Sequence, residues 1–218
     1  MQKSLILLGT APSWDQCKFD TEVWGVNGAY TVKDRVKNFR MDKIFITDRM
    51  FSPEGTMHFD IHVMNRMGKD FNCEFITLNP ISIGKLKLKS TPYPWDEIVE
   101  KFKSKYFSST ICHMLAYALW KNYEKISLYG IDMASRREYQ QQKGGVEYWL
   151  GRAQERGCEI TISQGSVLLV PPTTTPYGQD RKFDMSRIDP YGLLKGSSLY
   201  ECSTKSPTLP RPVRNSLQ

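Results

Sequence analysis

The apolar run near the amino terminus and the loop that follows it constrain the fold most strongly. Residues 5–8 are consecutive apolar residues, which stop at Gly9 and are followed by the small and turn-forming residues 10–13. A short, continuous apolar run is typical of a strand that is buried on both faces of a parallel sheet. Open α/β sheets bind their ligands beyond the carboxyl ends of such strands. The stretch therefore predicts a buried strand that leads into a tight loop at the ligand-binding edge of a sheet.

This loop has the composition of a nucleotide-binding loop. Gly9 lacks the Cβ that would keep a phosphate away from the backbone, and Thr10 and Ser13 carry hydroxyls. Pro12 fixes the turn while it withholds one N–H donor. The loop matches neither the GxGxxG nor the GKS/T phosphate-binding pattern. It is therefore consistent both with a nucleotide site and with an ordinary connection between a strand and a helix.

The pattern of an apolar run that stops at small or polar residues recurs along the chain. The residues at these later strand ends are Asn27 after residues 23–26, Asp48 after residues 44–46, Gly130 and Asp132 after residues 125–129, and Ser166 after residues 159–162. The carboxyl ends of parallel strands lie along one edge of a sheet. We therefore expect these residues to gather at the same edge as Gly9.

A helix with a hydroxyl-rich start is predicted at residues 111–120, where apolar residues recur with helical spacing. Ser108, Ser109 and Thr110 directly precede it. The first amides of a helix lack internal partners and favour an anion, so these hydroxyls have two candidate roles, capping the helix and contacting a phosphate or carboxylate. His113 falls among apolar residues of this helix, and we expect it to pack rather than to catalyse.

Strand and helix patterns alternate along residues 1–170, which predicts an α/β, Rossmann-like domain with a mostly parallel, doubly wound sheet. The basic residues 33–43 are expected to form a solvated helix, and residues 79–105 an irregular region with an edge strand or a flap. The composition changes after residue 170, since residues 171–218 carry seven of the twelve prolines. They predict an extended, Pro-rich C-terminal arm, whose apolar residues favour a homo-oligomer.

Composition narrows the class of protein further. The chain has 218 residues, no apolar run long enough to cross a membrane, and too short an apolar start for a signal peptide, so we expect a cytoplasmic protein without a transmembrane segment. The net charge of +7 indicates an acidic partner such as a nucleotide, a nucleic acid or an anionic lipid.

No metal site or resident cofactor is predicted. Asp48 lacks a second carboxylate two residues on, and His58 and His62 lie four residues apart without an acidic residue at the spacing of a zinc site. The five cysteines are scattered and form no CxxC pair, which argues against a disulfide framework.

The motifs, taken in order, resemble those of bacterial lipo-oligosaccharide sialyltransferases, and more loosely those of the motility-accessory and hydroxymethylpterin diphosphokinase group. The motifs are residues 7–13, 26–27, 108–110, 126–132 and 165–169. The resemblance covers residues 5–169 and implies a Rossmann-like nucleotide-binding fold. It implies that the first glycine loop and the following asparagine contact a cytidine nucleotide sugar, and that the serine-rich helix start faces its sugar or phosphate. With the other strand-end residues, the candidate nucleotide-binding set is Gly9, Thr10, Pro12, Ser13, Asn27, Ser108, Ser109, Thr110, Gly130 and Ser166.

The chain departs from this family at the general base. The position that corresponds to the family's catalytic histidine falls near Gln140, and no histidine follows His113. Tyr139 is the counterpart of the tyrosines that assist departure of the phosphate in the family. The catalytic candidates are therefore Tyr139 and Gln140, together with the strand-end carboxylates Asp48 and Asp132.

Three interpretations follow. The leading one is a metal-independent, nucleotide-sugar-dependent glycosyltransferase that acts on a glycan or a modified nucleic-acid base. The second is a diphosphokinase-like enzyme that binds Mg²⁺ through Asp48 and Asp132. The third is a non-catalytic, nucleotide-binding oligomer that has lost the histidine base. Under the first, Gly9→Val and Asn27→Ala are expected to abolish nucleotide binding without unfolding the protein.

Overall fold

The computed structural model describes residues 2–48, 73–78, 90–134 and 137–170, and for residues 137–140 the backbone alone. The expectations for His58, His62 and the C-terminal arm at residues 171–218 therefore lie outside the described residues.

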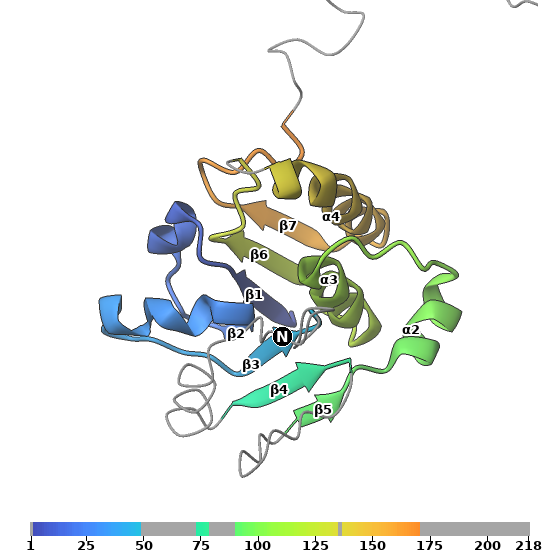
Figure 1. The fold of residues 1–218 in the computed structure, drawn as a ribbon, viewed down its shortest axis with the longest axis horizontal. Coiled ribbons are helices and arrows are strands. Elements are labelled where there is room, and N and C mark those ends of the chain that lie inside the picture. Colours follow the sequence, from blue (N-terminus) through green and yellow to red (C-terminus); the bar gives the residue numbers. More distant parts are fainter. Residues whose placement is uncertain (1, 49–72, 79–89, 135–136, 171–218) are drawn as a thin grey trace, which may run out of the picture. The chain divides into compact units, whose positions relative to one another are not determined.

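The fold is built on a seven-stranded sheet in the order β5-β4-β3-β2-β1-β6-β7 (Figure 1). The strands are β1 (Ser4–Leu8), β2 (Glu22–Val26), β3 (Lys43–Ile46), β4 (Glu74–Thr77), β5 (Ser90–Pro92), β6 (Lys125–Tyr129) and β7 (Glu159–Ile162). All neighbouring strands are parallel. The predicted Rossmann-like α/β fold is thus confirmed, with a sheet that is parallel throughout.

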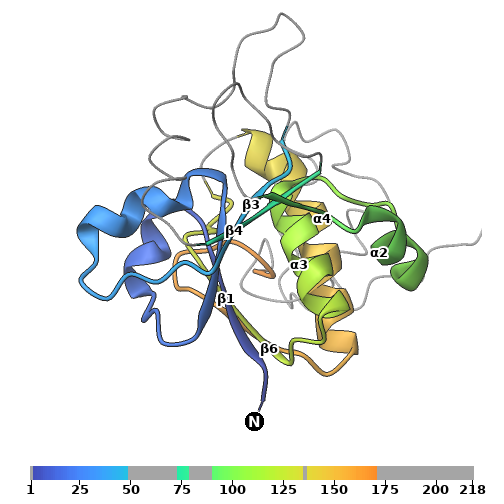
Figure 2. The same cartoon turned by 90° about the horizontal axis from the view of Figure 1, so that it is seen from below.

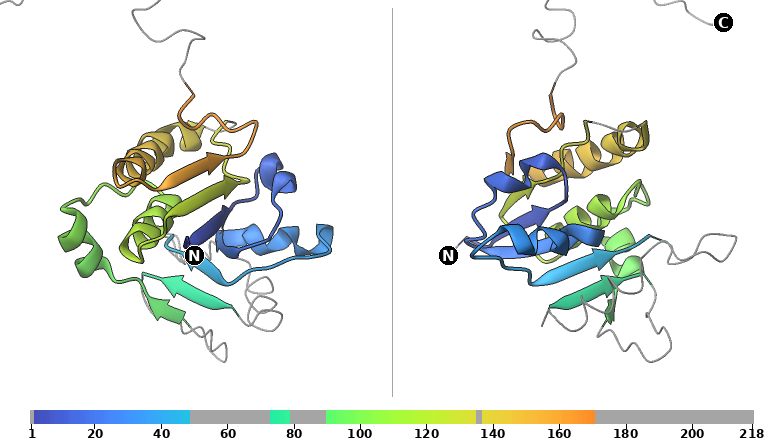
Figure 3. Two further views of the ribbon diagram at one scale, coloured as in Figure 1. Left: turned by 180° about the vertical axis from the view of Figure 1, so that it is seen from behind. Right: turned by 60° about the vertical axis from the view of Figure 1, so that its left-hand side comes forward.

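Helices cover both faces of the sheet (Figures 1 and 2). They are the 3-10 helices η1 (Pro12–Gln16) and η2 (Asn27–Arg35) and the α-helices α2 (Trp95–Phe102), α3 (Thr110–Trp120) and α4 (Arg137–Glu155). The alternation of side chains along β1 shows the two layers. Leu5 and Leu7 belong to the core with α3 and α4, whereas Ile6 and Leu8 belong to the core with η2. The two faces are also visible in Figure 3.

Two local predictions are wrong. Within residues 33–43 the helical turn ends at Arg35, because Val36 adopts an extended backbone and packs, with Phe39 and Met41, against the core of the η2 face. Residues 95–102, predicted as irregular, form α2, which begins after Pro94 and buries Ile98 and Phe102 one turn apart. A proline before the first turn and a buried i, i+4 pair are both helix signals, and the surrounding proline-rich segment obscured them.

The order of strands in the sheet reverses at β1. Strands β2 to β5 follow on one side of β1, and β6 and β7 follow on the other side. Here Gly9 and Gly130 touch through their backbones, and a Cβ on Gly9 would lie 2.1 Å from the carbonyl oxygen of Gly130. The amides of Gly9 and Ala11 donate to the carbonyls of Tyr129 and Gly130, at 2.8 and 3.0 Å. Gly130 also has a φ of +66°, which favours glycine. The glycine at position 9 thus permits two strand ends to meet.

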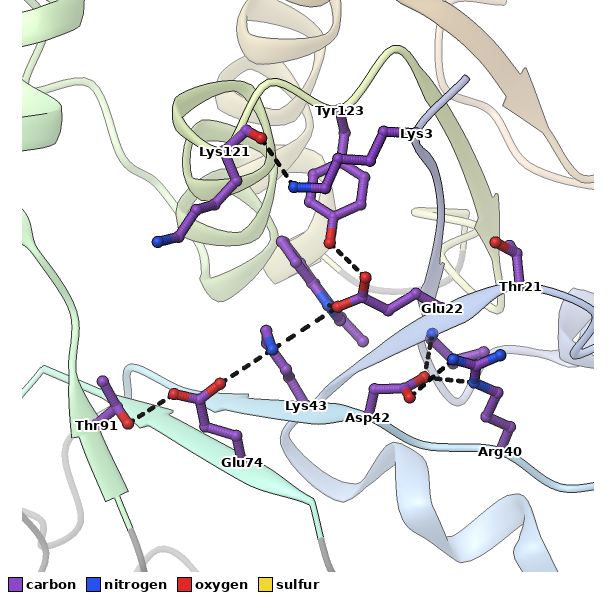
Figure 4. A network of polar contacts seen from close by, with 12 residues as sticks. Lys3, Thr21, Glu22, Arg40, Asp42, Lys43, Glu74, Thr91, Lys121 and Tyr123 are labelled. Carbon is purple, nitrogen blue, oxygen red and sulfur yellow. Dashed lines mark hydrogen bonds and ion pairs between the residues drawn. The ribbon is translucent and has the colours of Figure 1, made fainter. Parts of the chain in front are cut away.

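A polar network joins the amino-terminal ends of the central strands (Figure 4). The Glu22 carboxylate accepts hydrogen bonds from Nε1 of Trp24, at 2.7 Å, and from the hydroxyl of Tyr123. The ammonium of Lys43 lies 3.7 Å from Glu22 and 3.0 Å from Glu74. Residues at the starts of β2, β3 and β4 are thereby linked to one another and to the loop before β6.

Burial and contacts within this network determine the protonation states of Glu74 and Tyr123. Burial alone would raise the pKa of the Glu74 carboxyl, but the hydrogen bond from Thr91 and the ammonium of Lys43 lower it overall. Burial, followed by the hydrogen bond to Glu22, raises the pKa of the Tyr123 hydroxyl. Glu74 therefore stays ionised and Tyr123 neutral at pH 7, so the network holds the sheet together at the edge opposite the strand ends discussed below.

None of the helices in the described parts of the chain has the length and apolar character that crossing a membrane requires.

The contact of Gly9 with Gly130 predicts that Gly9→Ala destabilises the protein by about 1–3 kcal/mol or more, because the new methyl group meets backbone that cannot turn aside. The earlier expectation that Gly9→Val leaves the fold intact is wrong for the same reason. Gly151→Ala is the matched control. A Cβ there meets open space on α4, and alanine is the better helix former by up to about 1 kcal/mol. Chemical denaturation measures both changes, and equal stabilities of the two variants would contradict the close contact of Gly9 with the Gly130 backbone.

Candidate functional site

The strand-end residues fall into two clusters at the carboxyl edge of the sheet. The first, the Ser13 cluster, consists of Ser13, Gly130, Asp132 and Ser163. The amide of Ser13 donates to Oδ2 of Asp132 at 3.2 Å, and its hydroxyl donates to Oδ1 of Asp132. The same hydroxyl accepts from the amide of Gly130 at 2.9 Å and from the hydroxyl of Ser163 at 2.7 Å. A hydroxyl has one donor and two acceptor positions, so Ser13 is fully occupied.

This cluster is buried and has a structural role. Ser13 and Asp132 are 4% and 8% exposed, and both carboxylate oxygens of Asp132 accept from Ser13. The cluster joins η1, which follows β1, to the loops after β6 and β7. Since the amides of Gly9 and Ala11 are also occupied by β6, most of the predicted glycine loop is bonded to its own protein rather than open to a phosphate.

The remaining residues of the loop and of the β7 end differ in exposure. Thr10 and Pro12 are exposed at the surface of the loop. Ser166 donates its hydroxyl to the carbonyl of Ile131 at 3.0 Å, which fixes the β7 loop to the β6 end. Of the predicted residues in this half of the edge, Thr10 and Pro12 therefore lie where a ligand has access.

The second cluster, the Asn27 cluster, consists of Asn27, which follows β2, Thr47 and Asp48, which follow β3, and Thr110 at the start of α3. Nδ2 of Asn27 donates to Oδ2 of Asp48 at 2.6 Å. Thr110 donates to the same oxygen at 3.4 Å, and Thr47 donates to Thr110 at 2.8 Å. Asp48 is exposed, whereas Oδ1 of Asn27 is buried and has no hydrogen-bond partner among the described residues.

The start of α3 lies beside this cluster and has no side-chain cap. Ser109 is the N-cap residue, but its hydroxyl lies 3.4 Å from Sγ of Cys112 and makes no capping hydrogen bond. The hydroxyl of Ser108 donates to the carbonyl of Gln142 at 2.9 Å and so links α3 to α4. Of the two roles predicted for these hydroxyls, capping by Ser109 is not observed. The first-turn amides of α3 therefore have no side-chain cap at the positive end of the helix dipole.

The side chain of His113 packs next to Thr47 of the Asn27 cluster. Its ring packs against Phe107 and Tyr93, with centroid distances of 4.7 and 5.1 Å. Nδ1 lies 3.0 Å from the carbonyl oxygen of Ser109, and because a carbonyl can only accept, Nδ1 carries the proton. Burial lowers the pKa of His113, so the imidazole is neutral at pH 7. This agrees with a packing role. Thr47 follows β3 and was not among the predicted site residues, but it lies 3.5 Å from Nδ1 and links His113 to the cluster.

The structure does not bring the two strand-end carboxylates together. Asp48 follows β3 and Asp132 follows β6, and β1 and β2 lie between them. Three interstrand spacings correspond to about 14 Å, far more than the separation of two ligands of one Mg²⁺ ion. Among the described residues no group of three or more His, Cys, Asp or Glu side chains is arranged to hold a metal. Tyr139 and Gln140 lie in the first turn of α4, and their side chains are outside the described set.

Neither a protein-family model nor a curated protein sequence matches the chain. The fold is similar to that of the sialyltransferase CstII from Campylobacter jejuni. In its complex with the substrate analogue CMP-3FNeuAc the TM-score is 0.50, with 14% identity, over 74% of this chain and 80% of that chain. In its complex with cytidine-5'-monophosphate the TM-score is 0.51, also with 14% identity, over 77% and 82% of the two chains. The expected sialyltransferase-like fold is confirmed, and no comparison supports the resemblance to the motility-accessory and diphosphokinase group.

Asp132→Asn is expected to destabilise the protein by about 1–3 kcal/mol, because the amide would replace an acceptor with a donor opposite the N–H or O–H of Ser13. The control is Asp15→Asn, which removes an exposed carboxylate from η1, the 3-10 helix that contains Ser13. It should change stability by no more than about 0.5 kcal/mol. Urea denaturation distinguishes the two. Equal effects of the two substitutions would show that Asp132 is not a structural acceptor.

The lowered pKa of His113 predicts that acid weakens the fold. Because the folded-state pKa lies below the unfolded value of about 6.5, the unfolded chain binds the additional proton first. The stability that the neutral imidazole contributes is complete above pH 6.5 and is lost as the pH falls through the folded-state pKa. The free energy of unfolding should thus decrease from pH 7.5 to pH 5.5, and decrease less in His113→Phe. The same pH dependence in both proteins would contradict this assignment.

Proposed function

We propose that the chain is a nucleotide-sugar-dependent glycosyltransferase. One observation carries the proposal. Polar side chains from β2, β3 and α3 converge in the Asn27 cluster at the ligand-binding edge of the sheet, and they leave the buried Oδ1 of Asn27 without a partner among the described residues. A buried acceptor without a donor costs free energy unless a ligand supplies one. The similarity to a sialyltransferase fold supports this choice of ligand.

The proposed reaction uses the two parts of this edge differently. The exposed Thr10, on the loop after β1, is the proposed contact of the phosphate, because its hydroxyl can donate a hydrogen bond to a phosphate oxygen. In the reaction the bond between the anomeric carbon and the phosphate oxygen breaks, and the acceptor hydroxyl forms a new bond to that carbon and loses its proton. Asp48 is the proposed proton acceptor, since it is exposed whereas Asp132 is occupied by Ser13. Tyr139 and Gln140 stay catalytic candidates.

The acceptor is proposed to be a glycan or a modified nucleic-acid base, in keeping with the net charge of +7. We propose that the transfer needs no metal. The Mg²⁺-dependent diphosphokinase alternative loses support, because Asp48 and Asp132 are separated by two strands. A cytoplasmic location and a homo-oligomer formed through residues 171–218 stay predictions.

The test is a thermal-shift and mass-spectrometric panel of nucleotide sugars with CMP, UDP, GDP or dTDP as the carrier, with and without EDTA. We expect at least one nucleotide sugar to raise the melting temperature and to be consumed, equally well in EDTA. Binding without sugar release or transfer would favour the non-catalytic nucleotide-binding oligomer. A requirement for Mg²⁺ would contradict metal independence, and no binding at all would overturn the proposal.

Asn27→Gly is the variant that tests the site. Asn27 has a φ of +48°, so alanine would add backbone strain, whereas glycine removes the side chain at little conformational cost. We expect the ligand-induced shift to fall to a small fraction of its wild-type size. The matched control is Asn38→Gly, which removes an exposed side chain of the same type beyond η2 and should leave the shift unchanged. An unchanged shift in Asn27→Gly would remove Asn27 from the site.

A further inference from the structure

The direction of the hydrogen bonds in the Asn27 cluster indicates what kind of group it binds. Thr47 donates to Thr110, Thr110 donates to Asp48, and Asn27 donates to Asp48 from the opposite side. The hydroxyls of Thr47 and Thr110 and one N–H of Asn27 thus donate within the cluster. Two acceptors stay open, namely Oδ1 of Asn27, which has no hydrogen-bond partner among the described residues, and the exposed carboxylate of Asp48.

The orientation of the Asn27 amide follows from its partner. Because a carboxylate can only accept, the atom 2.6 Å from Oδ2 of Asp48 is the NH₂ group, and the carbonyl oxygen of Asn27 points elsewhere. Exchanging the two amide atoms would place two acceptors against each other. A ligand group that contacts Oδ1 of Asn27 must therefore donate a hydrogen bond to it.

We propose that the cluster is the subsite for the sugar of the donor, and that it selects an uncharged sugar that donates a hydroxyl hydrogen bond to Oδ1 of Asn27. This inference rests on the proposed function and specifies its substrate class. A sugar carboxylate offers acceptors alone and would face the negative charge of Asp48, so an acidic sugar is disfavoured both by hydrogen-bond polarity and by charge. The sugar would thereby differ in class from the acidic sugar of CMP-3FNeuAc in the similar sialyltransferase complex.

The neighbourhood of Asp48 agrees with this choice. Its carboxylate is bonded to the side chain of Thr110, the first residue of α3, so a resident negative charge already lies beside the positive end of that helix. His113, the basic side chain in contact with Thr47, is neutral at pH 7 because burial lowers its pKa. Neither group supplies a positive charge that would balance a sugar carboxylate.

The experiment compares the affinities of matched neutral and acidic sugars on the nucleotide that the panel identifies. The matched pairs are UDP-glucose with UDP-glucuronate and GDP-mannose with GDP-mannuronate. For a cytidine carrier, CMP-N-acetylneuraminate is compared with CMP alone, which carries no donor sugar. By calorimetry we expect the neutral sugar to bind at least about tenfold tighter than its acidic partner, as a like charge at close range implies. For cytidine we expect the acidic sugar to add no affinity to that of CMP.

Asp48→Asn tests the cause. It removes the charge but keeps an oxygen that can accept from Asn27, and we expect it to reduce the preference for the neutral sugar by about tenfold or more. Asp34→Asn, which removes an exposed carboxylate from the end of η2, is the charge-matched control and should leave the preference unchanged. Both variants are compared by affinity, so a loss of turnover does not affect the result.

The outcomes separate this inference from the proposed function. Tighter or equal binding of the acidic sugar by the wild-type protein would overturn the inference while leaving a nucleotide-sugar site in place. A preference that persists in Asp48→Asn would remove Asp48 as its cause and overturn the assignment of this subsite. If no nucleotide or nucleotide sugar binds, the proposed function fails, and the inference fails with it.

Discussion

The close backbone contact between Gly9 and Gly130 is the constraint on which the carboxyl edge depends. β1 lies at the point where the order of strands reverses, and its end must leave the sheet past the end of β6. A side chain at either glycine would collide with the other backbone, at 2.1 Å for Gly9 and 2.5 Å for Gly130. The contact places Ser13 next to the chain that follows β6, where its hydroxyl accepts from the Gly130 amide. A crevice at such a reversal is where open α/β sheets bind ligands.

The carboxyl edge of the sheet therefore has a closed half, formed by the Ser13 cluster, and an open half, formed by the Asn27 cluster. In the closed half Ser13 uses its amide and its hydroxyl on Asp132, Gly130 and Ser163, so these groups hold loops together. In the open half, Oδ1 of Asn27 has no hydrogen-bond partner among the described residues and the carboxylate of Asp48 is exposed. Rigid support for this half comes from the amino-terminal edge, where Lys43 bridges Glu22 and Glu74 at the starts of the same strands. Function is therefore better sought at β2 and β3 than at the glycine loop.

The sequence predicted the sheet well because a buried parallel strand needs a continuous apolar run, as in residues 5–8. It also placed Asn27, Asp48 and Thr110 correctly at strand or helix ends. It could not show which of them bond to each other, since partners such as Ser13 and Asp132 are 119 residues apart. Gly9 was linked to phosphate binding because the local sequence does not show that Gly9 touches Gly130 at the end of β6. That contact arises only in the tertiary fold.

The open half also shows how a buried histidine can influence a site without touching a ligand. Nδ1–H of His113 points at the carbonyl of Ser109 and lies 3.5 Å from the Thr47 hydroxyl, which donates to Thr110 and so toward Asp48. Because Nδ1 of His113 already carries a proton, the Thr47 hydroxyl cannot donate to it and donates to Thr110 instead. His113 thereby directs the Thr47 hydroxyl toward Thr110, whereas the orientation of the Asn27 amide follows from its bond to Asp48.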